Sequence, residues 1–193
     1  MRLATLAALA LICAGCGGSK GPDASAFQGT LLTPSQPAPP FTLRDQAGHA
    51  SGLAAAPGHY VIVTFLYTHC PDVCPVIAGM LNSVLRSAAG RRAHLEVLAV
   101  SVDPKRDTPA AVRRFVREHR LVPAFRYLTG SRAALAVVWN AFHIAAVAGP
   151  KGTVTHSSFE ILIDPAGKER LIYNATVTAI DVVQDLNVLR GAA

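Results

Sequence analysis

Residues 60–75 of this chain read YVIVTFLYTHCPDVCP. The run from 60 to 67 is β-branched, aliphatic and aromatic, which is typical of a strand buried on both faces. Cys70 and Cys74 follow, and Pro75 opens a stretch with helical periodicity. Two thiols four residues apart at the start of a helix lie about one turn apart on one face, close enough to share a metal ion or form a disulfide. A helix N-terminus also lowers the pKa of a thiol, so we expect thiolate character at this pair.

Strand and helix patterns alternate along the rest of the chain. Strands are predicted over residues 60–67, 95–102, 125–128, 154–163 and 170–173, with a turn at 164–167 between the last two. Predicted helices begin at Pro75 (ending at Gly90), at Pro109 (capped by Thr108), at Ser131 (running to about residue 142) and at Thr178. The order β-α-β-α-β-α-β-β-α predicts an α/β, thioredoxin-like fold: a central mixed sheet with covering helices, plus an N-terminal extension. Ligand sites in such sheets lie beyond the carboxyl ends of the strands, and the cysteines follow such an end.

The N-terminus has the pattern of an export signal. One positive charge at Arg2 precedes an apolar segment over residues 3–12, which is too short to span a bilayer. Ala14-Gly15-Cys16 resembles a lipobox, in which cleavage leaves a lipid-modified cysteine, although Cys13 stands where that motif usually has leucine. We therefore expect a lipoprotein signal peptide over 1–15, lipidation of Cys16, and attachment to the periplasmic face of a bacterial membrane. An ordinary cleaved signal is the alternative.

Composition divides the remaining chain into a tether and one domain. Residues 16–40 are rich in Gly, Ser, Pro and Ala and predict a flexible tether, with a short extended piece around residues 27–32. Residues 41–193 are long enough for one domain with a proper core, and 51% hydrophobic with 16% charged residues indicates a globular protein. The net charge of +6 comes largely from arginines expected on a solvated helix face. Export and the absence of a recognisable motif argue against nucleic acid, while attraction to anionic lipid or an acidic partner stays open.

The cysteine pair has a structural and a chemical interpretation. An exported protein can form a disulfide, but a bridge between residues four apart closes a tiny loop and stabilises the fold very little. Chemistry is the better account, and soft thiolates together with imidazole suit copper(I). Of the seven histidines, His156 begins the strand before the closing hairpin, which in this fold lies beside the cysteine loop. The residues alone leave open whether it is a ligand or a hydrogen-bonded structural residue. His69 adjoins Cys70 and is expected to tune the thiol rather than bind metal.

Five segments resemble the Sco/SenC family of copper chaperones for cytochrome c oxidase assembly. They are FLYTHCPDVCP at 65–75, VSVDPKRDTP at 100–109, LTG at 128–130, HSS at 156–158 and LIDP at 162–165. The resemblance implies that Cys70, Cys74 and His156 bind copper(I), and it leaves open whether they also bind copper(II). It further implies delivery to the copper-accepting subunit of cytochrome c oxidase, and exchange with other periplasmic copper chaperones or thiol reductants. Residues 103–109 are interpreted as a turn and helix cap, and Asp72 as an outer hydrogen-bond partner of the site.

Two other functions remain open for the same cysteines. A thiol–disulfide oxidoreductase would use Cys70 as the attacking thiol and Cys74 as the resolving thiol, reducing the cysteines of the oxidase copper site. Against this as the sole role, the spacing has three intervening residues where thioredoxin has two, and Thr155-His156 stands where such enzymes place a cis-proline. A peroxidase of the peroxiredoxin type is weaker still, because it gives His156 no role. The sequence therefore predicts primarily a metallochaperone and leaves enzymatic activity undecided.

Overall fold

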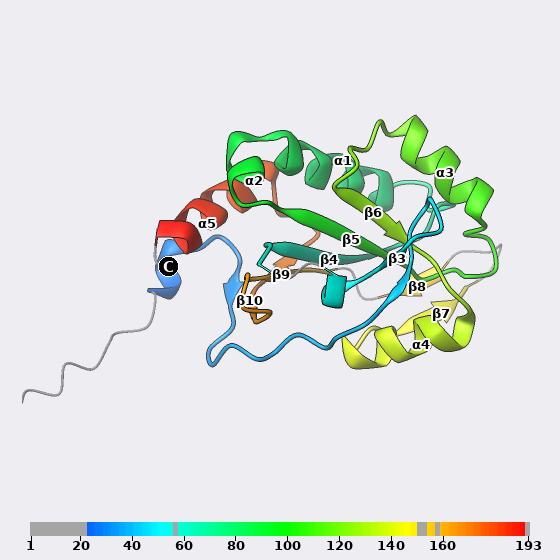
Figure 1. The fold of residues 1–193 in the computed structure, drawn as a ribbon, viewed down its shortest axis with the longest axis horizontal. Helices are drawn as coiled ribbons and strands as arrows, with labels where there is room; N and C mark the ends of the chain where they lie inside the picture. Colours follow the sequence, from blue (N-terminus) through cyan, green and yellow to red (C-terminus); the bar gives the residue numbers. More distant parts are fainter. Residues whose placement is uncertain (1–22, 56–57, 150–153, 157–158, 192–193) are drawn as a thin grey trace, which may run out of the picture.

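The computed structural model describes residues 23–55, 58–149, 154–156 and 159–191, which form a layered α/β domain (Figure 1). Its main sheet has six strands in the order β1-β10-β9-β4-β5-β6. These strands are β1 (Thr30–Leu31), β4 (Val61–Leu66), β5 (Glu96–Ser101), β6 (Phe125–Leu128), β9 (Phe159–Ile163) and β10 (Glu169–Asn174). Strands β4, β5 and β6 are parallel, whereas β9 is antiparallel to β4 and β10 to β9. The predicted mixed sheet and thioredoxin-like fold are confirmed.

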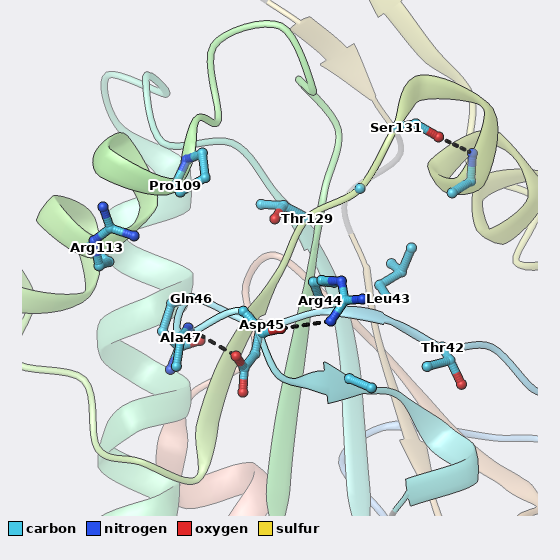
Figure 2. A pocket seen from close by; sticks show the side chains of 14 residues that line it. Thr42, Leu43, Arg44, Asp45, Gln46, Ala47, Pro109, Arg113, Thr129 and Ser131 are labelled. Atoms are coloured by element: carbon cyan, nitrogen blue, oxygen red, sulfur yellow. Dashed lines mark hydrogen bonds between the residues drawn. The ribbon is translucent and has the colours of Figure 1, made fainter.

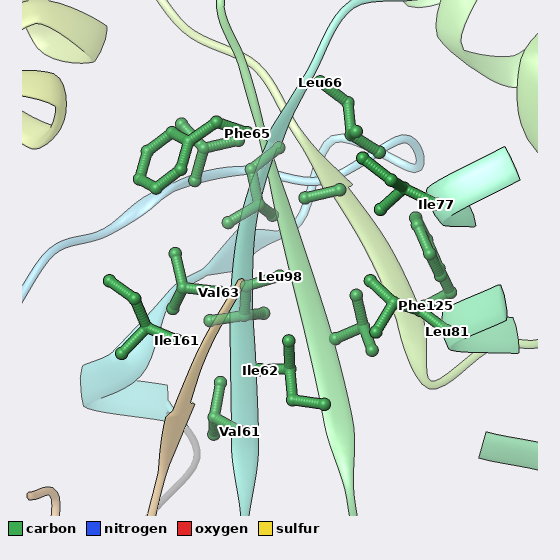
Figure 3. Close-up of a cluster of buried hydrophobic side chains, with 14 of the residues drawn as sticks. Val61, Ile62, Val63, Phe65, Leu66, Ile77, Leu81, Leu98, Phe125 and Ile161 are labelled. Atoms are coloured by element: carbon green, nitrogen blue, oxygen red, sulfur yellow. The ribbon is translucent and has the colours of Figure 1, made fainter. Parts of the chain in front are cut away.

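Strand β4 lies inside the sheet, between β9 and β5, and all six of its residues are buried. Successive side chains of a strand point to opposite faces, so an uninterrupted apolar run needs cover on both sides. Figure 3 shows Leu66 on the side of α1, near Ile77, while Val63 lies on the opposite side with Ile161 of β9. The sequence from 60 to 67 therefore places this strand in the middle of the core.

Helices cover both faces of the sheet. They are α1 (Val73–Arg86), α2 (Ala88–Arg92), α3 (Pro109–Glu118), α4 (Arg132–Ala141) and α5 (Ala179–Gly191), with short 3-10 turns η1 (Ala24–Ala26) and η2 (Leu53–Ala55). Helices α1, α2, α3 and α5 lie on one side and α4 on the other (Figure 1). The predicted caps at Thr108 and Ser131 are confirmed, since their side chains accept the N–H groups of Ala111 and Ala134. None of the helices in the described ranges is long and apolar enough to cross a membrane.

The segment before residue 41 differs from the predicted tether. Strand β1 adds to the edge of the main sheet by pairing with β10, and Phe27 is buried in the core. The carboxylate of Asp185 on α5 accepts the N–H groups of Gln28 and Gly29, each at 2.9 Å. These partners lie more than 100 residues away in sequence, which is why the local composition does not reveal them. Residues 27–38 thus belong to the folded domain, while residues 1–22, including Cys16 and the predicted signal, lie outside the described residues.

Two predicted element boundaries were also wrong. Gly90 does not end a helix: α1 ends at Arg86, and the Ser87 side chain accepts the Gly90 N–H to cap the short helix α2. The predicted strand 154–163 is two strands, because β8 (Val154–His156) pairs with β7 (Ala146–Ala148) in a separate two-stranded sheet. A second small sheet pairs β2 (Leu43–Arg44) with β3 (Ala50–Ser51). The turn at 164–167 is confirmed, with Gly167 at a φ of 75°.

Candidate functional site

Cys70 lies in the loop between β4 and α1, and Cys74 lies at the start of α1; the loop follows the carboxyl end of β4, one of the three parallel strands (Figure 1). Asp72 is the N-cap of α1 and accepts the Val73 N–H at 2.7 Å. Cys70 therefore precedes the helix, and Cys74 lies in its first turn. The end of the sheet where a ligand site is expected is where the thiols are found.

Cys70 and Cys74 are both free thiols and both buried. The Cys74 N–H, one of the unpaired amides at the start of α1, donates to the Cys70 sulfur at 3.3 Å. Burial raises the pKa of the Cys74 thiol, and its hydrogen bond with Cys70 raises it further. The expectation of a lowered thiol pKa is thus wrong for Cys74: it is buried among apolar groups, and its amide faces the other sulfur.

A buried carboxylate fastens the cysteine loop to the sheet. Asp107, in the loop between β5 and α3, accepts four hydrogen bonds. Its Oδ1 receives the backbone N–H of Thr68 at 2.9 Å and the Thr68 hydroxyl at 2.7 Å. Its Oδ2 receives the hydroxyls of Ser101, at 2.6 Å, and Tyr127, at 3.0 Å. Burial raises the pKa of Asp107 and these donors lower it; a carboxyl that accepts from all four is ionised.

The same bonds define the orientation of His69. The single hydroxyl proton of Thr68 goes to Asp107, so the contact of 3.0 Å between Thr68 Oγ1 and His69 Nδ1 is donated by the imidazole. His69 is otherwise exposed. Its Nδ1 therefore carries a proton and faces Thr68.

The third predicted ligand comes from the β7–β8 hairpin. His156 is the last residue of β8 and lies opposite Ala146 of β7. The backbone of Val154, two residues earlier, hydrogen-bonds to Tyr67, and the Tyr67 side chain in turn bonds to Cys70. This chain of contacts brings β8 next to the cysteine loop. The imidazole of His156 lies outside the described part of the structure, so the ligand set remains a prediction.

The other histidines with described side chains interact elsewhere. His59 pairs with Glu96 at 3.0 Å and stacks on His94, and His119 contacts the ring of Phe115. His49 lies 3.8 Å from Asp45 and is largely exposed. Among the described residues, no group of three or more His, Cys, Asp or Glu side chains is arranged to hold a metal ion.

Two cavities of the described structure are formed by residues other than the thiols. One of about 560 Å³ lies between the β2–β3 hairpin and the first turns of α3 and α4, and Figure 2 shows Arg44 and Arg113 among its lining residues. Another, of about 430 Å³, is lined by residues 102–105, residues 130–132, Ala146 and Val154, so it touches the hairpin. Neither is lined by Cys70 or Cys74.

The sequence did not reveal the contacts of Asp107. The interpretation of residues 103–109 as a turn and cap is confirmed, because the Asp107 N–H bonds to the Asp103 carbonyl and Thr108 caps α3. The bonds that Asp107 accepts from Thr68 span 39 residues. A polar residue between strand and helix patterns was the available signal, and it does not identify the partner.

The protein is similar to characterised ones over most of its length. A family model described as SCO1/SenC matches residues 30–190. The mitochondrial SCO2 homologue of Bos taurus is 34% identical over 134 residues, which cover 66% of this chain and 50% of that protein. The structure of Bradyrhizobium japonicum ScoI with copper bound has a TM-score of 0.67 at 32% identity, covering 79% of this chain and 98% of that one. BsSco, a cytochrome c oxidase assembly protein of the Sco family with a disulfide switch, has a TM-score of 0.68 at 25% identity, covering 82% and 96%.

Proposed function

Since this chain belongs to the SCO1/SenC family, we propose that it is a copper metallochaperone whose cargo is bound by Cys70, Cys74 and His156. The observation that carries the proposal is the pair of free thiols at the start of α1. They lie at the carboxyl end of β4, where ligand sites are expected in this kind of sheet. The copper-bound ScoI of Bradyrhizobium japonicum, at 32% identity, supports copper as the cargo.

The donor set suits copper(I). Thiolates are soft ligands that select copper(I), and a neutral imidazole is a compatible third donor. Because burial favours the protonated form of Cys74, copper must displace a proton there, and the bound ion then balances the buried charge. Three ligands leave one side of the ion open to attack by the ligands of an acceptor. This arrangement permits transfer without release of the free ion.

Contacts on the hairpin support His156 as the third ligand. The bond of Val154 to Tyr67, and of Tyr67 to Cys70, attaches β8 beside the thiols. His156 follows Val154 by two residues on the same strand, so the two share a face. The backbone bond of Val154 therefore places this end of β8 beside the cysteine loop.

The copper acceptor is the copper subunit of cytochrome c oxidase. BsSco belongs to a family of cytochrome c oxidase assembly proteins, which supports the choice of oxidase. Lipid modification of Cys16 would hold the domain at the periplasmic face of the membrane, next to such an acceptor. Other periplasmic copper chaperones would load it, and a thiol reductant would keep the pair reduced.

Titration of the reduced protein with copper(I) against a chromophoric chelator tests the ligand set. Wild type should bind one copper ion per chain, and Cys70→Ala and His156→Ala should each bind more weakly. His49→Ala is the matched control, because His49 is exposed and contacts Asp45. Full affinity in Cys70→Ala or His156→Ala would refute the ligand set. The air-oxidised protein should take up no copper(I) until reduced, and uptake in that state would count against the proposal.

A second function is thiol–disulfide exchange with the acceptor, favoured by the free and adjacent thiols. Cys70 as thiolate would attack an acceptor disulfide, and Cys74 would then attack Cys70 in the mixed disulfide. Two electrons and two protons pass to the acceptor, which becomes a dithiol, while Cys70 and Cys74 form the disulfide. His156→Ala separates the functions: a pure reductase keeps its exchange rate, whereas a copper carrier fails to metallate the oxidase.

A further inference from the structure

The loop that holds Cys70 is tied to the sheet by one buried side chain. Thr68, two residues before Cys70, gives both its backbone N–H and its hydroxyl to Oδ1 of Asp107. Asp107 is buried, and its Oδ2 is held in turn by Ser101 at the end of β5 and by Tyr127 of β6. The carboxylate thus connects two neighbouring strands, β5 and β6, to a single residue of the loop.

The two oxygens of this carboxylate accept hydrogen bonds from different parts of the protein. Among the residues that the structure describes, Oδ2 is bonded to groups of the sheet and Oδ1 to the loop residue Thr68. Ionised carboxylates accept short, strong hydrogen bonds, and the Thr68 hydroxyl at 2.7 Å is one of these. Removing a donor from one oxygen therefore perturbs the loop, and removing a donor from the other perturbs the sheet alone.

We propose that Asp107 is a positioning residue that, through Thr68, holds Cys70 in the geometry of the free dithiol. The inference rests on the proposed function for its relevance to copper. In this geometry Cys70 accepts the Cys74 N–H, and the two sulfurs remain unbonded. Closing a disulfide draws the sulfurs to about 2.05 Å and requires the loop to shift. A loop fastened through Thr68 resists that shift, which keeps the pair ready for copper.

Thr68→Val removes the hydroxyl donor while it preserves side-chain shape and the backbone N–H bond. We expect copper(I) affinity to fall by about tenfold, the low end of the range for outer partners of a metal site. Without copper, the equilibrium with dithiothreitol should move toward the Cys70–Cys74 disulfide by about tenfold, or about 30 mV. In that equilibrium the disulfide gains two electrons and two protons from dithiothreitol, which closes to its own cyclic disulfide.

Tyr127→Phe is the matched control because it removes one donor from the other oxygen of the same carboxylate. It should lower the free energy of unfolding but leave copper affinity and the disulfide equilibrium unchanged. Thr68→Ser, which keeps both donors, should restore wild-type values. Equal values for Thr68→Val and wild type, or an equal shift in Tyr127→Phe, would overturn the proposal.

Two more variants complete the test. His69→Ala removes the imidazole that bonds to Thr68, and the proposal requires it to leave the disulfide equilibrium unchanged. A shift there as large as in Thr68→Val would assign the effect to His69. Asp107→Asn should show at least the shift of Thr68→Val if it folds, and a smaller one would contradict the proposal. If wild type failed to bind copper, the proposed function would fall, while the disulfide equilibrium would still decide the role of Asp107.

Discussion

The loop with the thiols and the hairpin with His156 are attached to the domain in different ways. The loop continues directly from the buried central strand β4 and is held by Asp107 through two bonds to Thr68. The hairpin forms its own two-stranded sheet, and β8 reaches the loop through the bond of Val154 to Tyr67. The two proposed thiol ligands therefore lie in the core, and the third proposed ligand lies on a separate element. The thiols should dominate affinity, and the histidine should complete the site.

The largest effect should come from the loop. Cys70→Ala and Cys74→Ala should each weaken copper(I) binding by on the order of 1,000-fold or more, because losing a ligand costs more than the 10- to 100-fold cost of losing an outer partner. Competition with a chelator measures this, with circular dichroism to show that the variants fold. A loss below tenfold in both variants would contradict the claim that the thiols provide most of the copper affinity.

The strand that leaves the hairpin contains a buried acid, Glu160. Burial raises its pKa from 4.5 to about 7, and a hydrogen bond from Thr64, at 3.4 Å, lowers it. Its Oε2 has no hydrogen-bond partner in the ranges that the structure describes. Between these pH values the folded protein holds a proton that the unfolded chain has lost. The free energy of unfolding should therefore fall as the pH rises from 4.5 to 7, by about 3 kcal/mol.

Urea unfolding of the copper-free protein across this pH range measures the effect. Glu160→Gln has no charge to bury and should lose this pH dependence, so its stability relative to wild type should rise with pH. Glu118→Gln, on the exposed surface of α3, is the control and should follow wild type. A parallel pH dependence for Glu160→Gln and wild type would show that Glu160 does not titrate in this range.

The hairpin should contribute less to binding than the loop. His156→Ala should weaken copper(I) binding by about 100-fold, since the two thiolates remain and an imidazole is the weaker partner for copper(I). The free energy of unfolding without copper should stay within about 0.5 kcal/mol of wild type, because β8 pairs with β7 in a sheet separate from the main one. A loss larger than in Cys70→Ala would reverse the ranking of loop and hairpin.

The smallest effect should come from the helix that follows Asp107. Thr108→Ala removes the cap of α3, whose Oγ1 accepts the Ala111 N–H at 3.2 Å, and should cost about 1 kcal/mol of stability. Copper affinity should not change, because the cap acts on α3 and Asp107 holds the loop. A clear fall in copper affinity would mean that destabilising the start of α3 is enough to disturb the copper site.

The same contrast separates the features that local sequence patterns predict from those that they do not. Local pattern was sufficient for the buried strand over 61–66, the cysteine loop and the caps at Thr108 and Ser131, because each depends on residues close in the chain. It was insufficient where the partner is distant. Three features depend on folding: the pairing of β8 with β7, the bonds from residues 28–29 to Asp185, and the bonds from Thr68 to Asp107. The sequence predicted the two thiols of the candidate site, but it did not predict the hydrogen bonds that hold their loop to the sheet.

X-ray absorption at the copper edge on the reduced, copper-loaded protein tests the central claim most directly. The account predicts two sulfur neighbours and one imidazole nitrogen in wild type, with the nitrogen contribution absent from His156→Ala. An unchanged spectrum in His156→Ala, or a wild-type ion bound by sulfur alone, would contradict it.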